Sequence, residues 1–181
     1  MNIQFKSGIE IHQQLDVGKL FCRCPCITRR DNPDFTVYRK LRTSAGESGK
    51  IDVAARHELK KDRYFIYQGY KDTTCLVELD EEPPMPINEK AVEITLQIAK
   101  ALHCTILDEI TVMRKTVIDG SNTSGFQRTA LIGMNGYIET SEGKIEVESV
   151  CLEEEACQAI KRDEKHVEYN LSRLGIPLIE I

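Results

Sequence analysis

A glutamate and a histidine alternate with isoleucines near the start of the chain, in the run Ile9-Glu10-Ile11-His12. On a strand, positions i and i+2 share a face, so Glu10 and His12 are expected to point the same way. A carboxylate among buried apolar residues is costly unless a partner replaces its lost hydration. A divalent cation does this, and Mg²⁺ prefers carboxylate oxygens. Pattern alone, however, favours an amphipathic strand whose glutamate and histidine face water.

Two more carboxylate groups come late in the chain. Glu180 again lies between two isoleucines, and residues 151–155 end in three consecutive glutamates after a predicted hairpin strand. No spacing rule links residues this far apart in the sequence. The residue pattern therefore leaves open whether these groups meet the glutamate and histidine near the start.

Cysteines form a second candidate metal site. Cys22, Cys24 and Cys26 lie within five residues on a predicted loop, and Cys75 precedes Glu78 at the spacing of a C-x₂-C pair. Structural zinc sites usually use pairs spaced C-x₂₋₄-C and need four ligands. Two alternatives stay open. One is a zinc site made of Cys22, Cys24, Cys75 and one further ligand; the other, which the pattern favours, is isolated reduced thiols.

Basic residues precede a polar loop in the middle of the chain. Arg114 and Lys115 end a strand-like run, and a loop of small residues follows over 119–125. Small residues let backbone N–H groups approach an anion, and arginine offers a fork for phosphate or carboxylate. The spacings of a P-loop and of a dinucleotide fingerprint are absent. The residues alone thus favour an ordinary polar loop.

The composition suits one globular domain with a packed core. The chain has 181 residues, of which 41% are hydrophobic and 29% charged. The net charge of −5 argues against a free-standing nucleic-acid binder. It hides a basic pole over residues 19–42 and an acidic pole over residues 139–155. A basic region can meet phosphates and an acidic one can hold cations, although two solvated faces are the simpler interpretation.

The sequence predicts a cytoplasmic protein. It contains no run of about 18 apolar residues, which excludes a membrane-spanning helix. The N-terminus lacks the basic start and apolar segment of a signal peptide. In a reducing compartment, the seven cysteines are expected to be thiols, metal ligands or core residues.

Periodicity predicts many short strands and few helices. Strands are expected over residues 3–15, 35–41, 64–70, 75–80, 109–117, 169–174 and 178–181. A hairpin is expected from residues 137–140 and 144–150. Helices are expected from the N-cap Asn88 to about His103, and over residues 53–61 and 156–163. This pattern predicts an α+β fold with a mainly antiparallel sheet.

Four ordered blocks make the sequence specific enough to compare with a known family. They are GIEIHQQLD with KLFCRCP (residues 8–25), residues 112–129 from VMRK to GFQRT, CLEEEA (151–156) and LGIPLIEI (174–181). The chain resembles the GatB/GatE proteins, which are subunits of tRNA-dependent amidotransferases. Residues 75–84 and 118–129 are most similar to the archaeal GatE branch.

The resemblance implies a fold and a reaction. The family's catalytic domain, the cradle, is similar to glutamine synthetase and would account for the α+β fold. It uses Mg-ATP to phosphorylate the side chain of the glutamate in Glu-tRNA(Gln). Ammonia then displaces phosphate and leaves Gln-tRNA(Gln). The ammonia comes from GatD, an asparaginase-like partner, so a hetero-oligomer is expected. This logic is physically sensible, because phosphorylation gives a poor acyl donor a leaving group and Mg²⁺ neutralises phosphoryl charge.

The resemblance also assigns residues. It places the Mg²⁺ ligands, which are also the expected catalytic residues, on His12, Glu154 and Glu180, with Glu10 beside them. It places the substrate and nucleotide side of the pocket on Arg114, Lys115, Gln127 and Arg128. Cys22, Cys24 and Cys75 match a zinc site of many relatives, in which the last cysteine is here Glu78.

Family members continue for several hundred residues beyond position 181. The resemblance therefore identifies residues 1–181 as the N-terminal portion of the cradle, without its remainder, the helical domain or the tRNA-binding tail. We expect a fragment or a truncated gene product. The alternative function is a non-catalytic module that binds RNA or a partner through the basic pole.

Overall fold

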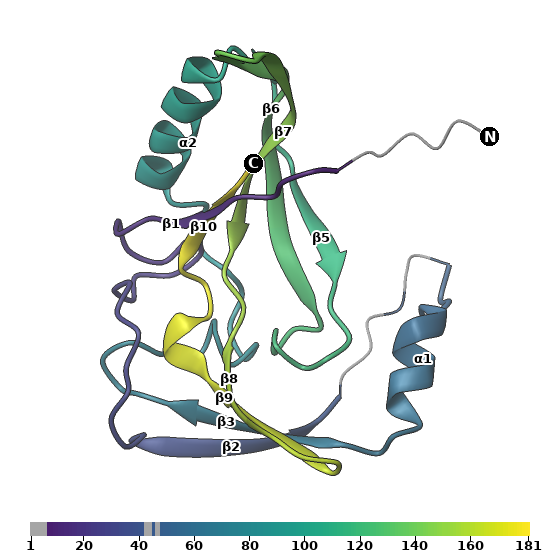
Figure 1. Cartoon of the computed structure of the whole chain (residues 1–181). Coiled ribbons are helices and arrows are strands. Elements are labelled where there is room, and N and C mark those ends of the chain that lie inside the picture. Colours follow the sequence, from purple (N-terminus) through teal and green to yellow (C-terminus); the bar gives the residue numbers. More distant parts are fainter. Residues whose placement is uncertain (1–6, 42–44, 46–47) are drawn as a thin grey trace, which may run out of the picture.

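Two sheets and two α-helices make up the part of the chain that the computed structural model describes, residues 7–41, 45 and 48–181 (Figure 1). The larger sheet has the order β1 (His12–Gln14), β10 (Pro177–Glu180), β7 (Gly143–Glu154), β6 (Phe126–Thr140) and β4 (Thr105–Ile106), and β5 (Val112–Thr116) also pairs with β6. The smaller sheet has the order β2 (Phe35–Lys40), β3 (Tyr64–Gly69), β9 (His166–Asn170) and β8 (Gln158–Arg162). All strand pairs are antiparallel except β3 with β9, so the predicted α+β fold with mainly antiparallel sheets is confirmed.

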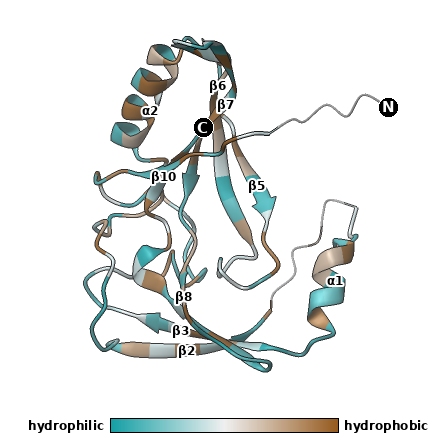
Figure 2. Ribbon diagram, viewed as in Figure 1, coloured by the Kyte–Doolittle hydropathy of each residue, from teal (hydrophilic) through white to brown (hydrophobic). Residues whose placement is uncertain are grey.

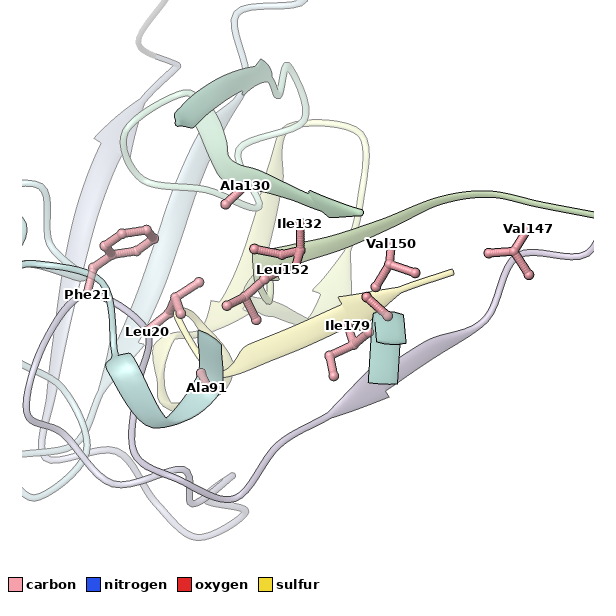
Figure 3. Close-up of a cluster of buried hydrophobic side chains, with 10 residues drawn as sticks. Leu20, Phe21, Ala91, Ala130, Ile132, Val147, Val150, Leu152 and Ile179 are labelled. Carbon is pink, nitrogen blue, oxygen red and sulfur yellow. The ribbon is translucent and has the colours of Figure 1, made fainter. Parts of the chain in front are cut away.

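Helix α2 (Glu89–Ala101) covers one face of the larger sheet (Figure 1). It begins where predicted, because the Asn88 side chain accepts hydrogen bonds from the backbone N–H groups of Lys90 and Ala91. Its buried face packs on an apolar cluster, most of which Figure 3 shows. The cluster comprises Leu20, Phe21, Ala91, Ala99, Ala130, Ile132, Val147, Val150, Leu152 and Ile179. Figure 2 shows hydrophobic residues along α2, whereas β5 is largely hydrophilic.

The smaller sheet has its own hydrophobic core. Two tyrosines of this core hydrogen-bond to the loop over residues 119–125. The hydroxyl groups of Tyr67 and Tyr169 donate to the backbone carbonyls of Gly120 and Asp119, each at 2.7 Å. Gly120 has a φ of +83°, and a Cβ there would lie 2.6 Å from the Phe65 ring. A side chain at this position would therefore both strain the backbone and clash with the core.

Several predicted elements match the structure closely. Besides α2, these are β2, β3, β10, the helix α1 (Val53–Leu59) and the β6–β7 hairpin, whose strands are longer than expected. The predicted strand over 109–117 is shortened to β5. The strand expected over 3–15 forms a ladder only over β1 within the described residues, although Ile11 still exchanges two backbone hydrogen bonds with Ile181. Residues 3–6 lie outside the described part of the chain.

Three predictions of secondary structure were wrong. Residues 76–80 form consecutive turns, and residues 75–80 contain no strand, because Glu78 points inward to Lys19 and Cys22. Residues 156–163 contain β8 rather than a helix, because pairing with β9 overrides local helix propensity. The strand expected over 169–174 ends at Asn170, whose side chain caps a 3₁₀ turn (Leu171–Arg173).

None of the helices in the described ranges could span a bilayer. The longer of the two, α2, has 13 residues, whereas a transmembrane helix needs about 20.

Candidate metal and substrate site

Glu10, His12 and Glu180 meet at the edge of the larger sheet. His12 pairs with Glu180 in the β1–β10 ladder, so the two side chains share a face. His12 Nε2 lies 3.2 Å from Glu10 Oε1 and 3.2 Å from Glu180 Oε2. One ligand atom from each residue lies within 4.8 Å of the others. We call these three residues the Glu-His-Glu cluster. Its side chains are partly exposed, which leaves room for water or a substrate oxygen.

Glu153 and Lys115 adjoin this cluster on the same face. The Lys115 Nζ lies 2.9 Å from Glu153 Oε1 and 3.6 Å from Glu180 Oε2. Thr129 Oγ1 donates to Glu153 Oε1 at 2.7 Å, and the Glu153 side chain is almost fully buried. Burial opposes the charge of the Lys115 ammonium, but pairing with Glu153 outweighs it and raises the pKa of Lys115. Burial and the nearby Glu153 charge raise the pKa of Glu180.

Glu154 points to the other face of the sheet. Consecutive residues of a strand alternate between faces, so Glu153 and Glu154 cannot both reach the Glu-His-Glu cluster. Glu154 instead accepts from Arg128, whose Nη1 lies 3.2 Å from both carboxylate oxygens and whose backbone N–H lies 3.0 Å from one. Burial raises the pKa of Glu154 despite this pairing. The structure thus brings three of the four predicted magnesium ligands together and places Glu154 apart from them.

The resemblance picked Glu154, but it is the neighbouring Glu153 that lies on the face of the Glu-His-Glu cluster. The signal that could have found it is strand register: Glu153 lies opposite Leu178, on the same face as Glu180 two residues further along β10. That register is not visible in the sequence, because it depends on how β10 pairs with β7.

The four predicted substrate residues are divided between the two faces. In the β5–β6 ladder Lys115 pairs with Gln127, and Arg114 pairs with Arg128. Lys115 therefore faces the Glu-His-Glu cluster, while the guanidinium groups of Arg114 and Arg128 lie over the Phe126 ring at 4.8 and 5.2 Å from its centroid. Gln127 Nε2 donates to the backbone carbonyl of Glu154 at 2.8 Å and so braces β6 against β7.

Arg128 and Glu154 also line a pocket behind the sheet. Lys19, Glu78 and Asn122 contribute to its wall. The buried Asn122 amide has no hydrogen-bond partner for either its nitrogen or its oxygen within the described part of the chain. The pocket therefore offers both a buried donor and a buried acceptor.

Cys22, Cys24, Cys75 and Glu78 converge beside this pocket, and two of them, Cys22 and Glu78, line it. One ligand atom from each lies within 4.8 Å of the others. The Cys22 thiol donates to Glu78 Oε1 at 2.9 Å, and the neighbouring thiol of Cys22 lowers the pKa of Cys24 to about 7 against the opposing effect of burial. Burial, reinforced by Glu78, raises the pKa of Cys75 to about 12. All seven cysteines are free thiols.

A buried lysine neutralises the carboxylate of this group. The Lys19 side chain is fully buried, and its Nζ lies 2.9 Å from Glu78 Oε1 and 2.7 Å from the Thr73 carbonyl. Burial opposes the charge on Glu78, but Lys19 and the hydrogen bonds from Cys22 and Cys75 outweigh it and lower the pKa of Glu78.

The basic pole is largely engaged within the protein. Lys19 is buried, and three other cations of the pole form ion pairs: Arg29 with Asp31 and Asp72, Arg39 with Glu81, and Lys40 with Asp62. Of the six basic residues of the pole that the structure describes, four are therefore already paired with carboxylates of the protein itself.

The fold and this site define the class of the protein. The chain belongs to the GatB/GatE catalytic domain family, whose model matches residues 5–181. The predicted family membership is confirmed.

The relatives of the chain point to one branch of that family. Proteins named as the E subunit of glutamyl-tRNA(Gln) amidotransferase are 55% identical in Methanocaldococcus jannaschii (over 99% of this chain), 56% in Thermoplasma volcanium (over 97%) and 52% in Archaeoglobus fulgidus (over 97%). The chain spans 29% of the length of each of these relatives. The predicted similarity to the archaeal GatE branch is confirmed.

Proposed function

We propose that this chain is the N-terminal portion of the catalytic (cradle) domain of a cytoplasmic glutamyl-tRNA(Gln) amidotransferase. The family and the names of the relatives support this proposal. The whole protein, as a hetero-oligomer with GatD, converts Glu-tRNA(Gln) to Gln-tRNA(Gln). The glutamate side chain takes the γ-phosphoryl group of ATP, and ammonia delivered by GatD then displaces phosphate.

The convergence of the Glu-His-Glu cluster is the observation that carries the proposal. Two carboxylates and one imidazole from segments 168 residues apart meet within 4.8 Å. This donor set fits Mg²⁺ or Mn²⁺, since carboxylates suit both ions and the partial exposure leaves positions for water and phosphate oxygens. A bound Mg²⁺ would neutralise charge on the transferring phosphoryl group. Glu10, His12 and Glu180 would hold it, and Glu154 does not share their face.

The remaining predicted substrate residues take different roles. Lys115 faces the cluster and offers a positive charge to a phosphate or carboxylate there. Arg128 holds the buried Glu154 carboxylate, and Gln127 fixes the backbone between the two faces. We propose that these two residues position the sheet behind the nucleotide rather than contact it.

Replacing His12 by alanine tests the metal site. The wild-type 181-residue chain is expected to bind one Mn²⁺, measured by loss of the free-ion signal in electron paramagnetic resonance, with Mg²⁺ competing. We expect H12A to weaken Mn²⁺ binding by at least about tenfold, because it removes one of the three protein ligands. Loss of even a residue that only supports a ligand typically lowers metal affinity by about 10–100-fold. Glu148 lies exposed on β7, and E148Q serves as the matched control.

Equal Mn²⁺ binding by H12A and the wild type would place the metal elsewhere. A chain that binds neither Mn²⁺ nor Mg-ATP but binds RNA saturably and with a steep salt dependence would instead favour the non-catalytic module.

We also propose that Cys22, Cys24, Cys75 and Glu78 bind one Zn²⁺. Three thiols and a carboxylate supply four ligand atoms, and both thiolate sulfur and carboxylate oxygen bind Zn²⁺. Zinc binds thiolates, so its binding would release the protons of the three thiols, and the affinity should fall as the pH falls. Lys19 offsets the negative charge that three thiolates and a carboxylate would concentrate.

Metal analysis of the purified chain checks the zinc site. We expect one zinc per chain in the wild type, near-complete loss in C24S, and full retention in C104S, because Cys104 lies outside the cluster. Removing zinc with a chelator should lower the melting temperature of the wild type and leave that of C24S unchanged. A wild-type chain that carries no zinc after expression in zinc-supplemented medium would favour isolated thiols.

A further inference from the structure

The Lys115 ammonium lies close to the position that a cation bound to the Glu-His-Glu cluster would occupy. Its Nζ is 3.6 Å from Glu180 Oε2, the same oxygen that lies 3.2 Å from His12 Nε2. A divalent cation held by His12 and Glu180 would therefore share that oxygen with the ammonium. Two positive charges this close repel each other, so the ion and the ammonium compete for Glu180.

The contact with Glu153 keeps the Lys115 ammonium near the cluster even when it is not paired with Glu180. The Glu153 carboxylate is 1% exposed, lies 2.9 Å from the Lys115 Nζ and accepts from Thr129 Oγ1. Without the ammonium, this charge would be buried and unpaired, which is strongly unfavourable. The Lys115 side chain is itself half exposed, so it can shift while it keeps its contact with Glu153.

We propose that Lys115 is the exchangeable counter-ion of the Glu-His-Glu cluster. Its ammonium bridges Glu153 and Glu180 in the metal-free protein. On binding of a divalent cation to the cluster, the ammonium would leave Glu180 and stay paired with Glu153. Lys115 thereby lowers the affinity of the cluster for the cation. Once displaced from Glu180, its ammonium faces the phosphate or carboxylate group that binds together with the cation. The inference rests on the metal site proposed above.

The proposal predicts opposite changes in cation affinity when the Lys115 ammonium is removed and when the Glu153 carboxylate is removed. Since the ammonium and the cation oppose each other at Glu180, removing the ammonium must strengthen cation binding. Removing the anchor Glu153 instead leaves Lys115 to pair with Glu180 alone, and this must weaken cation binding. A lysine that merely held Glu180 in place would give weaker binding in both cases.

The double variant K115M/E153Q is the sharper test. It removes one positive and one negative charge, so the net charge is unchanged, and it leaves no unpaired buried ion. We expect its Mn²⁺ dissociation constant to be about fivefold lower than that of the wild type, the size expected for loss of one half-exposed ion pair. E153Q alone should raise the dissociation constant by a similar factor.

A matched control is available on the same strand pair. Glu139 and Lys144 form an exposed ion pair at the tip of the β6–β7 hairpin. Position 139 lies ten residues from Thr129 along β6, or about 33 Å at ~3.3 Å per residue. The variant K144M/E139Q removes the same two charges there and should leave Mn²⁺ binding within twofold of the wild type.

A second measurement follows Lys115 directly. We expect its side-chain nuclear magnetic resonance signal, assigned by its loss in K115M/E153Q, to shift on titration with Mg²⁺ in the wild type. The shift should saturate with the Mg²⁺ dissociation constant obtained by competition with Mn²⁺.

The outcomes separate the two proposals. If wild-type binding depends on His12 but the double variant binds Mn²⁺ equally or more weakly, Lys115 is not a counter-ion and the metal site stands. If neither the wild type nor the double variant binds Mn²⁺, the metal site is wrong and the counter-ion falls with it.

Discussion

Replacement of Lys19 by methionine is expected to lower the free energy of unfolding by about 3–5 kcal/mol, the usual cost of removing one partner of a buried ion pair. Methionine fills much of the same volume but leaves the Glu78 carboxylate, which is 3% exposed, without its cation. The Thr73 carbonyl also loses its donor. Urea denaturation of the zinc-free chain at neutral pH measures the difference.

The pH dependence of this loss distinguishes the ion pair from simple packing. The folded-state pKa of Glu78 is lowered below its unfolded value of about 4.3. The pair therefore stabilises the fold fully above that value, and this contribution disappears as the pH falls through the lowered pKa. In K19M the buried Glu78 carboxylate lacks its cation, so it takes up a proton at a higher pH than in the wild type. The gap in stability between wild type and K19M should therefore narrow as the pH falls, from above the unfolded value down through the lowered pKa.

Two variants serve as controls for this prediction. K90M removes an exposed lysine from α2 and should change stability by less than about 0.5 kcal/mol. K19M/E78Q removes both charges and should recover most of the loss. A K19M loss below about 1 kcal/mol, or one independent of pH, would show that the pair contributes little.

The sequence anticipated elements whose signals are local. The N-cap Asn88, the apolar spacing of α2 and the hairpin around residues 141–143 each depend on a few neighbouring residues. The strand expected over 75–80 and the helix expected over 156–163 failed because distant residues decide both segments. Glu78 turns inward to a lysine 59 positions earlier, and β8 takes its conformation from its pairing with β9.

In the candidate site, too, the local features could be predicted from the sequence and the long-range pairings could not. The i, i+2 spacing of Glu10 and His12 correctly placed them on one side of a strand, as their contact shows. Which late glutamate joins them depends on the register of β10 against β1 and β7, which no spacing rule provides. Resemblance to a family named Glu180, which joins them, and Glu154, which instead contacts Arg128. The alternation of faces then separates Glu153 from Glu154.

Under the proposed function, replacement of Glu180 by glutamine is expected to lower the rate of amidation by about 10²-fold or more in a full-length protein that carries this segment and is assembled with the proposed partner GatD. Glutamine keeps the shape of the side chain and its place in the β1–β10 ladder, but it removes the charge that His12 and Lys115 both contact. The loss should appear in kcat, because neutralisation of phosphoryl charge matters most in the transition state. Formation of Gln-tRNA(Gln) from Glu-tRNA(Gln) under saturating Mg-ATP measures it.

Two further measurements locate the defect. Ammonia production by GatD should be unchanged in E180Q, whereas tRNA-dependent ATP hydrolysis should fall with amidation. The matched control is E148Q, which removes a carboxylate from an exposed position of β7 and should remain within twofold of the wild type. If E180Q and H12A both retained full amidation while E154Q lost it, the reacting centre would lie on the opposite face of the sheet, in the pocket where Arg128 holds Glu154.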